Sequence, residues 1–462
     1  MRHLPAILLI TALLTPAYAR SLEPAAPARD DLRGVPATVA DRPVAGSPAG
    51  PAETLTVEDV VRLVLARNSS LKEVEDAVDV FKAKVDESRA ALLPGVRGEA
   101  SYARIGPVPS IDFPGLGNFQ LFPANNYDIH TGLRQMLHDG KRTRTAIDLA
   151  GAQVEGAQER GDILKRDLEF QAAQFFYTIL FLQESIRVQN DHLKTLDDHL
   201  AIARKKLEIG TAVELEVLNT QVRIAAVRNQ ITDLENALEK QQVALRRLAG
   251  LEGSGPLTLK GEFARLPHGL DPEVLVPAAM EKRPEGKALA NLKRTAEIQA
   301  KLAGLHDAPV VSVNLSVGAK NGYIPDLNPL KLNFVAAIEA VVPIFEGHLT
   351  RSMKAEAAAN LKTVEDKSRE LEDLVRSEVE QAISDVTASE RKLETVEVNI
   401  EQARKALAFA KARYEAGTLT NLEVLDTEEA HTDAEFMKLQ ALYKLVLSRL
   451  SLRRAAGEGA AE

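Results

Sequence analysis

The chain contains no cysteine and no tryptophan, and aromatic residues make up only 4% of its 462 positions. Without cysteine it can form no disulfide, no thiolate nucleophile and no cysteine metal site. The 9 histidines show no pair at metal-ligand spacing, and we find neither a Ser/His/Asp grouping nor a phosphate-cradling glycine loop. We therefore expect no enzyme, no cofactor and no metal site.

Net positive charge is also lacking, since the formal net charge is −9. This balance argues against nucleic acid as a partner, because phosphate binding requires clustered lysine and arginine. Long apolar runs are equally absent: after the first 19 residues, none reaches the roughly 18–20 residues that a transmembrane helix needs. If the chain enters a membrane, we expect strands rather than helices.

The N-terminus has the pattern of an export signal. A basic start at Arg2 precedes an apolar run over 4–14, and Ala17 and Ala19 form a small-residue cleavage site. This pattern predicts a signal peptide over 1–19. Residues 20–53, which are rich in Pro, Ala and Gly, predict a flexible leader.

One stretch of the chain occurs twice at an offset of 207 residues. The sequence LEVLNTQ at 215–221 returns as LEVLDTE at 422–428, and Gly210-Thr211 returns as Gly417-Thr418. A constant offset over this length indicates one structural unit used twice without insertion.

Long segments without glycine or proline predict long helices; they are 162–209, 211–249, 348–416 and 418–456. At 1.5 Å per residue, 348–416 would form a rod of about 100 Å. Its apolar residues alternate steps of three and four, which is a heptad seam: Leu393, Val396, Ile400, Ala403, Leu407, Ala410 and Tyr414. Before the first long segment, Gly151 and Gly156 interrupt the helical pattern.

Each pair of helices is joined by a predicted tight turn. Gly210 and Gly417 stand where a left-handed residue would end the incoming helix. Two threonine–glutamate pairs then have the spacing of a capping box: Thr211 with Glu214, and Thr420 with Glu423. Two helical hairpins follow, with tips near 210 and 417.

Four segments of about ten residues alternate apolar and polar side chains, as strands do: 96–105, 127–137, 310–318 and 331–342. This pattern is typical of outer-membrane barrel strands, whereas a soluble sheet with one buried face is the alternative. Four strands cannot close a barrel, and an open edge in lipid leaves backbone groups unsatisfied. We therefore expect an oligomer that pools its strands.

These segments give the predicted organisation: repeat 1 over 54–250, a connector with equatorial helices over 251–308, the remainder of repeat 2 over 309–457, and a tail over 458–462. Helices are expected over 56–92 and near 271–281 and 285–306. The external loop at 106–126 is about eight residues longer than its counterpart at 319–330. The predicted fold class is mainly α with a small β part, in two tandem repeats of two strands plus a long helical hairpin.

Several motifs resemble those of the TolC-type outer-membrane factor family (outer membrane efflux proteins). They are the opening segment 55–68, the strand-to-helix junctions 137–142 and 343–347, and the tips 207–218 and 414–426. The resemblance implies a homotrimer whose transmembrane β-barrel continues as a periplasmic α-helical barrel. It implies an exit duct in the outer membrane, in contact with outer-membrane lipid, serving a tripartite efflux pump or type I secretion system.

The resemblance also implies partners and site residues. The duct would dock on a periplasmic adaptor bound to an inner-membrane transporter of RND or ABC type, through a tip containing Gly210, Thr211, Gly417 and Thr418. A closing contact would map onto Glu216 and Tyr414, although Tyr414 also completes the heptad seam and packing alone is the alternative. The family's latch arginine corresponds to Leu419, and the lipid-bearing cysteine of many relatives is missing.

Glu423 and Asp426 lie three residues apart and therefore share one helix face. In an oligomer they would form acidic rings that bind cations in the tunnel. The alternative is a solvated helix start, where carboxylates suit the helix dipole.

Two other function classes compete with the duct. A periplasmic coiled-coil adaptor usually has one helical hairpin, whereas two are predicted here. A structural envelope protein without a channel would not explain four alternating strands.

Overall fold

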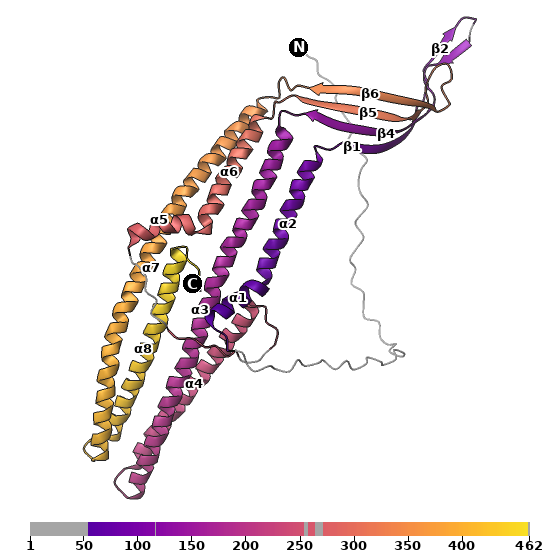
Figure 1. The fold of residues 1–462 in the computed structure, drawn as a ribbon. Helices are drawn as coiled ribbons and strands as arrows, with labels where there is room; N and C mark the ends of the chain where they lie inside the picture. The colour runs from indigo at the N-terminus through magenta and orange to yellow at the C-terminus, as the bar shows by residue number, and fades with distance from the viewer. Residues whose placement is uncertain (1–53, 116, 254–256, 264–270, 461–462) are drawn as a thin grey trace, which may run out of the picture. The chain divides into compact units, whose positions relative to one another are not determined.

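The computed structural model describes residues 54–115, 117–253, 257–263 and 271–460 (Figure 1). The predicted signal peptide and leader lie outside this range. Helices dominate the described chain, with a smaller strand part, so the predicted fold class is confirmed. In chain order the elements are α1 Val57–Arg67, α2 Ser69–Ala90, β1 Gly95–Arg104, β2 Ser110–Phe113, β3 Gly117–Gln120, β4 Asn125–His138, α3 Arg142–Glu208, α4 Glu214–Leu248, α5 Pro272–Lys282, α6 Pro284–Gly304, β5 Val310–Lys320, β6 Lys331–Val341, α7 Leu349–Glu415 and α8 Asn421–Ala455.

The predicted repeat is present in the positions of the helices. α3 and α7 each have 67 residues, α4 and α8 each have 35, and the bounds in the second copy lie 207 residues after those in the first. Both bounds of α5 lie 215 residues after those of α1. The difference of eight residues falls in the loop between the two strands of the first repeat.

The two long helices α3 and α7 are continuous rods. At 1.5 Å per residue each is about 100 Å long. The expected interruption of α3 at Gly151 and Gly156 is wrong, because an isolated glycine costs a helix only about 1 kcal/mol. Packing against α6 offsets that cost: Asn291 donates a hydrogen bond to the carbonyl of Ala152 at 2.9 Å. A Cβ on Gly156 would lie 3.0 Å from the Asn291 amide nitrogen.

The single helix expected over 56–92 is broken at Asn68, whose backbone is extended (ψ 127°). The Asn68 side chain stabilises this break. Its oxygen accepts a hydrogen bond from the N–H of Ser70 at 2.9 Å, and its amide donates to the carbonyl of Leu248 at 2.9 Å. The joint between α1 and α2 is thereby fixed to the end of α4.

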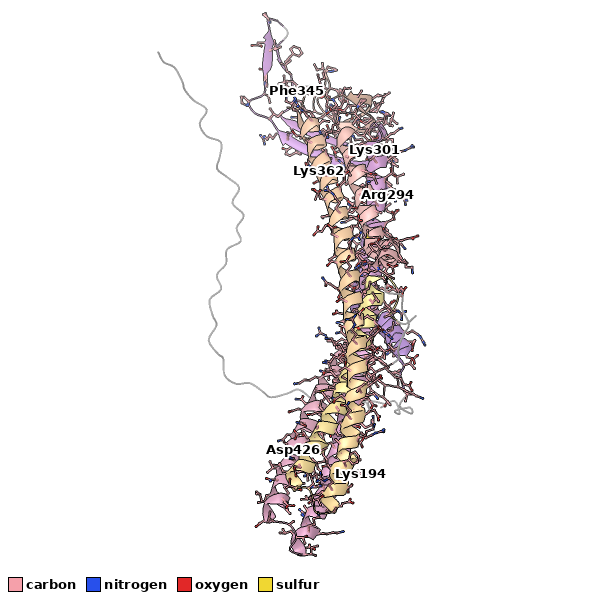
Figure 2. All side chains as sticks on the ribbon, turned by 90° about the vertical axis from the view of Figure 1, so that its left-hand side faces the viewer. Lys194, Arg294, Lys301, Phe345, Lys362 and Asp426 are labelled. Carbon is pink, nitrogen blue, oxygen red and sulfur yellow. The ribbon has the colours of Figure 1, made fainter. Side chains whose placement is uncertain are left out.

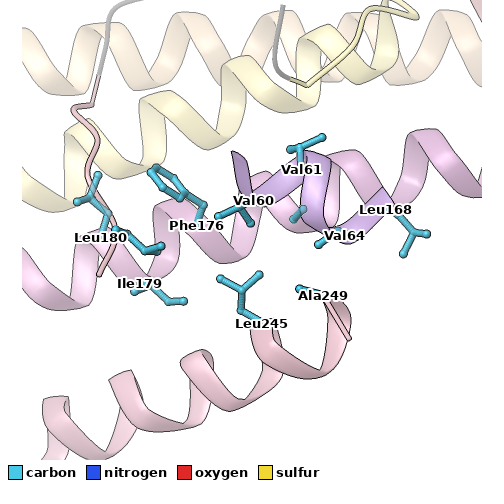
Figure 3. Packing of buried hydrophobic residues seen from close by; sticks show 11 residues of the cluster. Val60, Val61, Val64, Leu168, Phe176, Ile179, Leu180, Leu245 and Ala249 are labelled. Carbon is cyan, nitrogen blue, oxygen red and sulfur yellow. The ribbon is translucent and has the colours of Figure 1, made fainter. Parts of the chain in front are cut away.

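A buried apolar cluster surrounds this joint (Figure 3). α1 contributes Val60 and Val64, α3 contributes Phe176 and Ile179, and α4 contributes Leu245, each no more than 2% exposed. At about 25 cal/mol per Å² of buried apolar surface, side chains of this size each contribute roughly 1.5–3 kcal/mol.

The strands β1, β4, β5 and β6 form one antiparallel sheet in that order. One face is apolar, and Leu332, Phe334 and Ile338 on β6 are 85%, 79% and 76% exposed. Within the protomer, the described residues therefore leave this apolar face uncovered. No helix in the described ranges is both long enough and apolar enough to cross a membrane.

The structure adds two strands that the sequence pattern did not predict. β2 and β3 pair with each other as a separate hairpin (Figure 1), which we call the finger. Each has four residues, which is too short for an alternating pattern to be recognised. The finger occupies the longer loop of the first repeat, and its counterpart loop contains no strand among the described residues.

Candidate functional site

The two hairpin tips have the same backbone geometry. Gly210 and Gly417 both adopt φ +75°, a left-handed conformation that glycine adopts without strain. The N–H of Thr211 donates to the carbonyl of Lys206 at 2.8 Å, and that of Thr418 to Arg413 at 2.9 Å. Both glycines are left-handed as predicted, and the hydrogen bonds are those of a Schellman motif.

The outgoing helices are capped differently. Thr420 and Glu423 form the predicted capping box at the start of α8. The capping box predicted for Thr211 and Glu214 is wrong, because the residue at the N-cap of α4 is Val213, which has no polar side chain. The Thr211 hydroxyl instead donates back to the carbonyl of Lys206 at 3.1 Å.

Glu216 of α4 and Tyr414 of α7 are brought together at the tips. The Tyr414 hydroxyl donates to the Glu216 carboxylate at 3.5 Å, the outer limit for a hydrogen bond. Tyr414 is buried, at 5% exposure. Burial, reinforced by the adjacent Glu216 charge, raises the pKa of Tyr414 to about 12, so the phenol stays a neutral donor.

Three further residues, which sequence reasoning missed, complete a tip cluster: His199, Lys206 and Asn421. Lys206 donates to the carbonyl of Tyr414 at 2.8 Å, and its Nζ lies 3.5 Å from the centre of the Tyr414 ring. His199 Nε2 lies 2.5 Å from Asn421 Oδ1, and the His199 ring centre is 5.1 Å from that of Tyr414. The Asn421 amide donates to the carbonyl of Glu216 at 3.3 Å.

The tip cluster therefore joins α3, α4, α7 and α8, so it connects the two repeats. Its contacts span about 200 residues of sequence, which is why no local pattern could have indicated them. The heptad seam did place Tyr414 inward correctly. Leu419, at the position of the family's latch arginine, packs against the apolar group of Ala410, Tyr414 and Val424.

The two predicted acidic residues of α8 have separate partners. The Glu423 carboxylate accepts hydrogen bonds from the hydroxyl and N–H of Thr420 at 2.7 and 2.9 Å, which lower the pKa of Glu423. Asp426, near the hairpin tips in Figure 2, accepts from Arg223 of α4 at 2.6 Å, and Arg223 also pairs with Glu429. Both carboxylates are thus engaged within the protomer, a circumstance that the sequence did not reveal.

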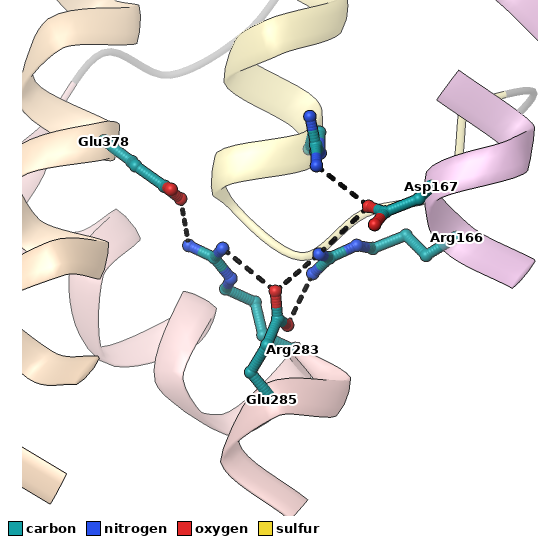
Figure 4. Close-up of polar contacts among 6 residues, drawn as sticks. Arg166, Asp167, Arg283, Glu285 and Glu378 are labelled. Carbon is teal, nitrogen blue, oxygen red and sulfur yellow. Dashed lines mark hydrogen bonds and ion pairs between the residues drawn. The ribbon is translucent and has the colours of Figure 1, made fainter. Parts of the chain in front are cut away.

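An ion-pair network crosses the middle of the helices (Figure 4). Glu285 accepts from Arg166 of α3 at 2.5 and 2.7 Å and from Arg283 at 3.2 Å, and Arg283 donates to Glu378 of α7 at 2.7 Å. Arg454 of α8 joins through Asp167 at 2.9 Å. Burial alone would raise the pKa of Glu285, but the hydrogen bonds from both arginines lower it to about 2.

Within the described ranges, no group of three or more histidine, aspartate or glutamate side chains could hold a metal ion.

Comparison with known proteins agrees with this architecture. A family model described as "Outer membrane efflux protein" matches residues 60–251 and 275–458. The chain is 24% identical over 323 residues to the pyoverdine export outer membrane protein OpmQ of Pseudomonas putida, covering 68% of this chain and 67% of that one. It is 23% identical over 387 residues to the outer membrane protein TolC of Vibrio cholerae, covering 81% and 84%. A crystal structure of CusC superimposes with a TM-score of 0.73 at 18% identity, covering 87% and 92%.

Proposed function

The chain belongs to the outer membrane efflux protein family, and from this membership we propose that it is the exit duct of a tripartite efflux pump or type I secretion system. It would conduct substrate passively across the periplasm and outer membrane. A relative named for pyoverdine export supports a role in export. The two helices of about 100 Å, α3 and α7, each of which forms a hairpin with a 35-residue helix and is continuous with a two-faced sheet, are the observation on which this proposal depends.

We propose that three copies of the chain pool their strands into one transmembrane barrel. β1 and β6 are the edges of the four-stranded sheet, and unpaired edges are not tolerated in lipid. The exposed apolar side chains of Leu332, Phe334 and Ile338 would then face the outer-membrane lipid. The polar face of the same sheet would line the lumen.

The tip cluster would act as the gate of this duct. It holds the two hairpins together through Tyr414, Glu216 and Lys206, and opening would require these contacts to break. A periplasmic adaptor that binds the splayed tips more tightly than the closed ones would shift the population toward the open state. Gly210, Thr211, Gly417 and Thr418, at the ends of the hairpins, are the residues proposed to contact it, and an RND or ABC transporter would lie beyond the adaptor.

Single-channel recording in planar bilayers tests the gate. Combining Glu216→Ala with Tyr414→Phe should raise the conductance of the closed duct several-fold, because the only side-chain link between these residues is lost. Glu235→Ala, on the exposed face of the same helix α4, is the matched control and should leave conductance unchanged. Equal conductance in wild type and double variant would exclude this contact as the gate.

Cell fractionation tests the location independently. The duct should be recovered in the outer-membrane fraction and should migrate in a heat-modifiable way. Recovery in the soluble periplasm would instead favour the adaptor class of protein.

A further inference from the structure

A concavity of about 960 Å³ lies where the polar face of the sheet meets the start of α3 and the end of α6. Three arginines line it: Arg97 of β1, Arg134 of β4 and Arg142 of α3. The remaining polar lining comes mainly from β5, through Ser312, Asn314 and Ser316.

The strand register places two of these arginines side by side. Arg97 lies opposite Gly132, and Arg134 lies opposite Gly95, so the two are diagonal neighbours on one face. Diagonal neighbours on paired strands are about 7–8 Å apart. Because each arginine faces a glycine across the β1–β4 pair, no side chain opposes it on that side, whereas Asn314 of β5 lies opposite Arg134 on the other.

None of the three arginine side chains has a carboxylate partner among the described residues. The two carboxylates that line the concavity are engaged elsewhere. Glu99 pairs with His130 at 3.4 Å, and Asp139 accepts a hydrogen bond from the N–H of Thr143 at 2.6 Å, in the first turn of α3. The concavity therefore contains three arginines and two carboxylates, an excess of one positive charge, and neither carboxylate is ion-paired with any of the three arginines.

We propose that this basic concavity binds the anionic group, carboxylate or phosphate, of a soluble solute that moves along the polar face. This rests on the proposed function, in which that face lines the duct. Planar guanidinium groups bind carboxylate and phosphate in a bidentate way, and a bound anion relieves the repulsion between neighbouring arginines. Arg97, Arg134 and Arg142 thereby favour anionic over cationic solutes at this level of the duct.

The second repeat lacks the same charges. Ser312 stands at the position of Arg97, by the offset of 215, and Val341 stands at that of Arg134, by the offset of 207. In an oligomer, arginine-lined concavities would therefore alternate with strands that contain no arginine.

Calorimetric titration of the detergent-solubilised protein with citrate tests this binding without requiring transport. Arg97→Gln with Arg134→Gln should weaken citrate binding about tenfold or more, because two charge-assisted bidentate contacts are removed. Arg104→Gln is the control, since Arg104 is at the far end of β1 on the opposite face of the sheet. Absence of saturable citrate binding by the wild type, or equal affinity in the double variant, would overturn the proposal.

Reversal potentials in a KCl gradient, measured in purely zwitterionic bilayers, give the second readout. The reversal potential of the double variant should shift, relative to that of the wild type, in the direction of higher permeability to K⁺ than to Cl⁻. An unchanged reversal potential at normal conductance would refute the basic concavity and leave the duct standing, whereas absence of conductance in both the wild type and the gate variant Glu216→Ala, Tyr414→Phe would refute the duct. If the purified wild type retains anionic phospholipid, the double variant does not, and the wild type fails to bind citrate, then the arginines bind a lipid headgroup. That result would overturn the proposal of a soluble ligand.

Discussion

At the scale of single residues, Tyr414 serves two purposes that sequence reasoning presented as alternatives. It completes the heptad seam of α7, with 5% of its surface exposed, and it also donates to Glu216 of α4. The seam was predictable because it depends on local spacing alone. The approach of Lys206, His199 and Asn421 was not, because these contacts depend on how the two hairpins lie against each other.

Gly318 of β5 is a position where the absence of a side chain is required. A Cβ there would lie 2.2 Å from the carbonyl oxygen of Ile129 and 2.4 Å from Cβ of His130. Gly318→Ala should therefore push β4 and β5 apart and destabilise the sheet by about 1–3 kcal/mol. The lower temperature at which the heat-modifiable species converts on gels would report this loss. Gly98→Ala on β1 is the control, because nothing lies within 4 Å of the added Cβ, and it should leave the conversion temperature unchanged. An equal decrease of the conversion temperature in both variants would contradict the steric argument.

At the scale of the elements, helix ends were predicted best where a backbone requirement acts. The left-handed glycines at 210 and 417 end their helices as expected, whereas the N-cap of α4 was misplaced because Val213 offers no side-chain acceptor. The break at Asn68 was missed because it depends on the Leu248 carbonyl, 180 residues away. A tertiary partner decided the break at Asn68, whereas the N-cap of α4 was decided within the turn, where the Thr211 hydroxyl donates to the Lys206 carbonyl.

The ion-pair network around Glu285 links α3, α6 and α7, so its loss should destabilise both repeats. Glu285→Gln should destabilise the protein by about 3 kcal/mol, because the buried Arg166 and Arg283 would lose a charged partner. Thermal unfolding followed by the helical circular dichroism signal measures this. Glu155→Gln removes an exposed pair with Arg294 (Figure 2) between the same two helices α3 and α6, and should change stability by less than about 1 kcal/mol. Similar losses of stability in Glu285→Gln and Glu155→Gln would show that the network contributes no more than an exposed ion pair.

The pH dependence of the same pair has a definite sign. The pKa of Glu285 is about 2 in the folded protein, against an ordinary value of 4.5, so its charge stabilises the fold above about pH 4.5. That contribution is lost as the pH falls toward 2. The wild type should therefore lose more stability between pH 5 and pH 2 than Glu285→Gln does, and parallel pH profiles would contradict the assignment.

At the scale of the whole molecule, the repeat and the mainly helical class were predictable, because they are expressed as fixed offsets and long glycine-free segments. The extra hairpin of β2 and β3 was not, although the surplus of eight residues indicated where the two repeats differ. A count of residues shows that a loop is longer, but it does not show that the additional residues pair with each other.

The finger should be dispensable for folding. Among the described residues β2 pairs with β3 alone, in a sheet of its own, so replacing 106–124 with the shorter loop of the second repeat should leave the melting temperature within a few degrees of wild type. Conductance in bilayers should also persist. Failure of the shortened chain to assemble would show instead that the finger contributes to the oligomer.

The equal lengths of α3 and α7, 67 residues each, have a consequence for how such a chain can change. One inserted residue would rotate everything beyond it by about 100° around the helix axis, turning the seam outward and separating Tyr414 from Glu216. Two turns, close to seven residues or about 10 Å, are the smallest step that restores the phase. A change in one copy must also be matched in the other for the tips to remain level. The distance from the sheet to the tips can therefore change only in steps of about one heptad, and α3 and α7 must change by the same number of residues.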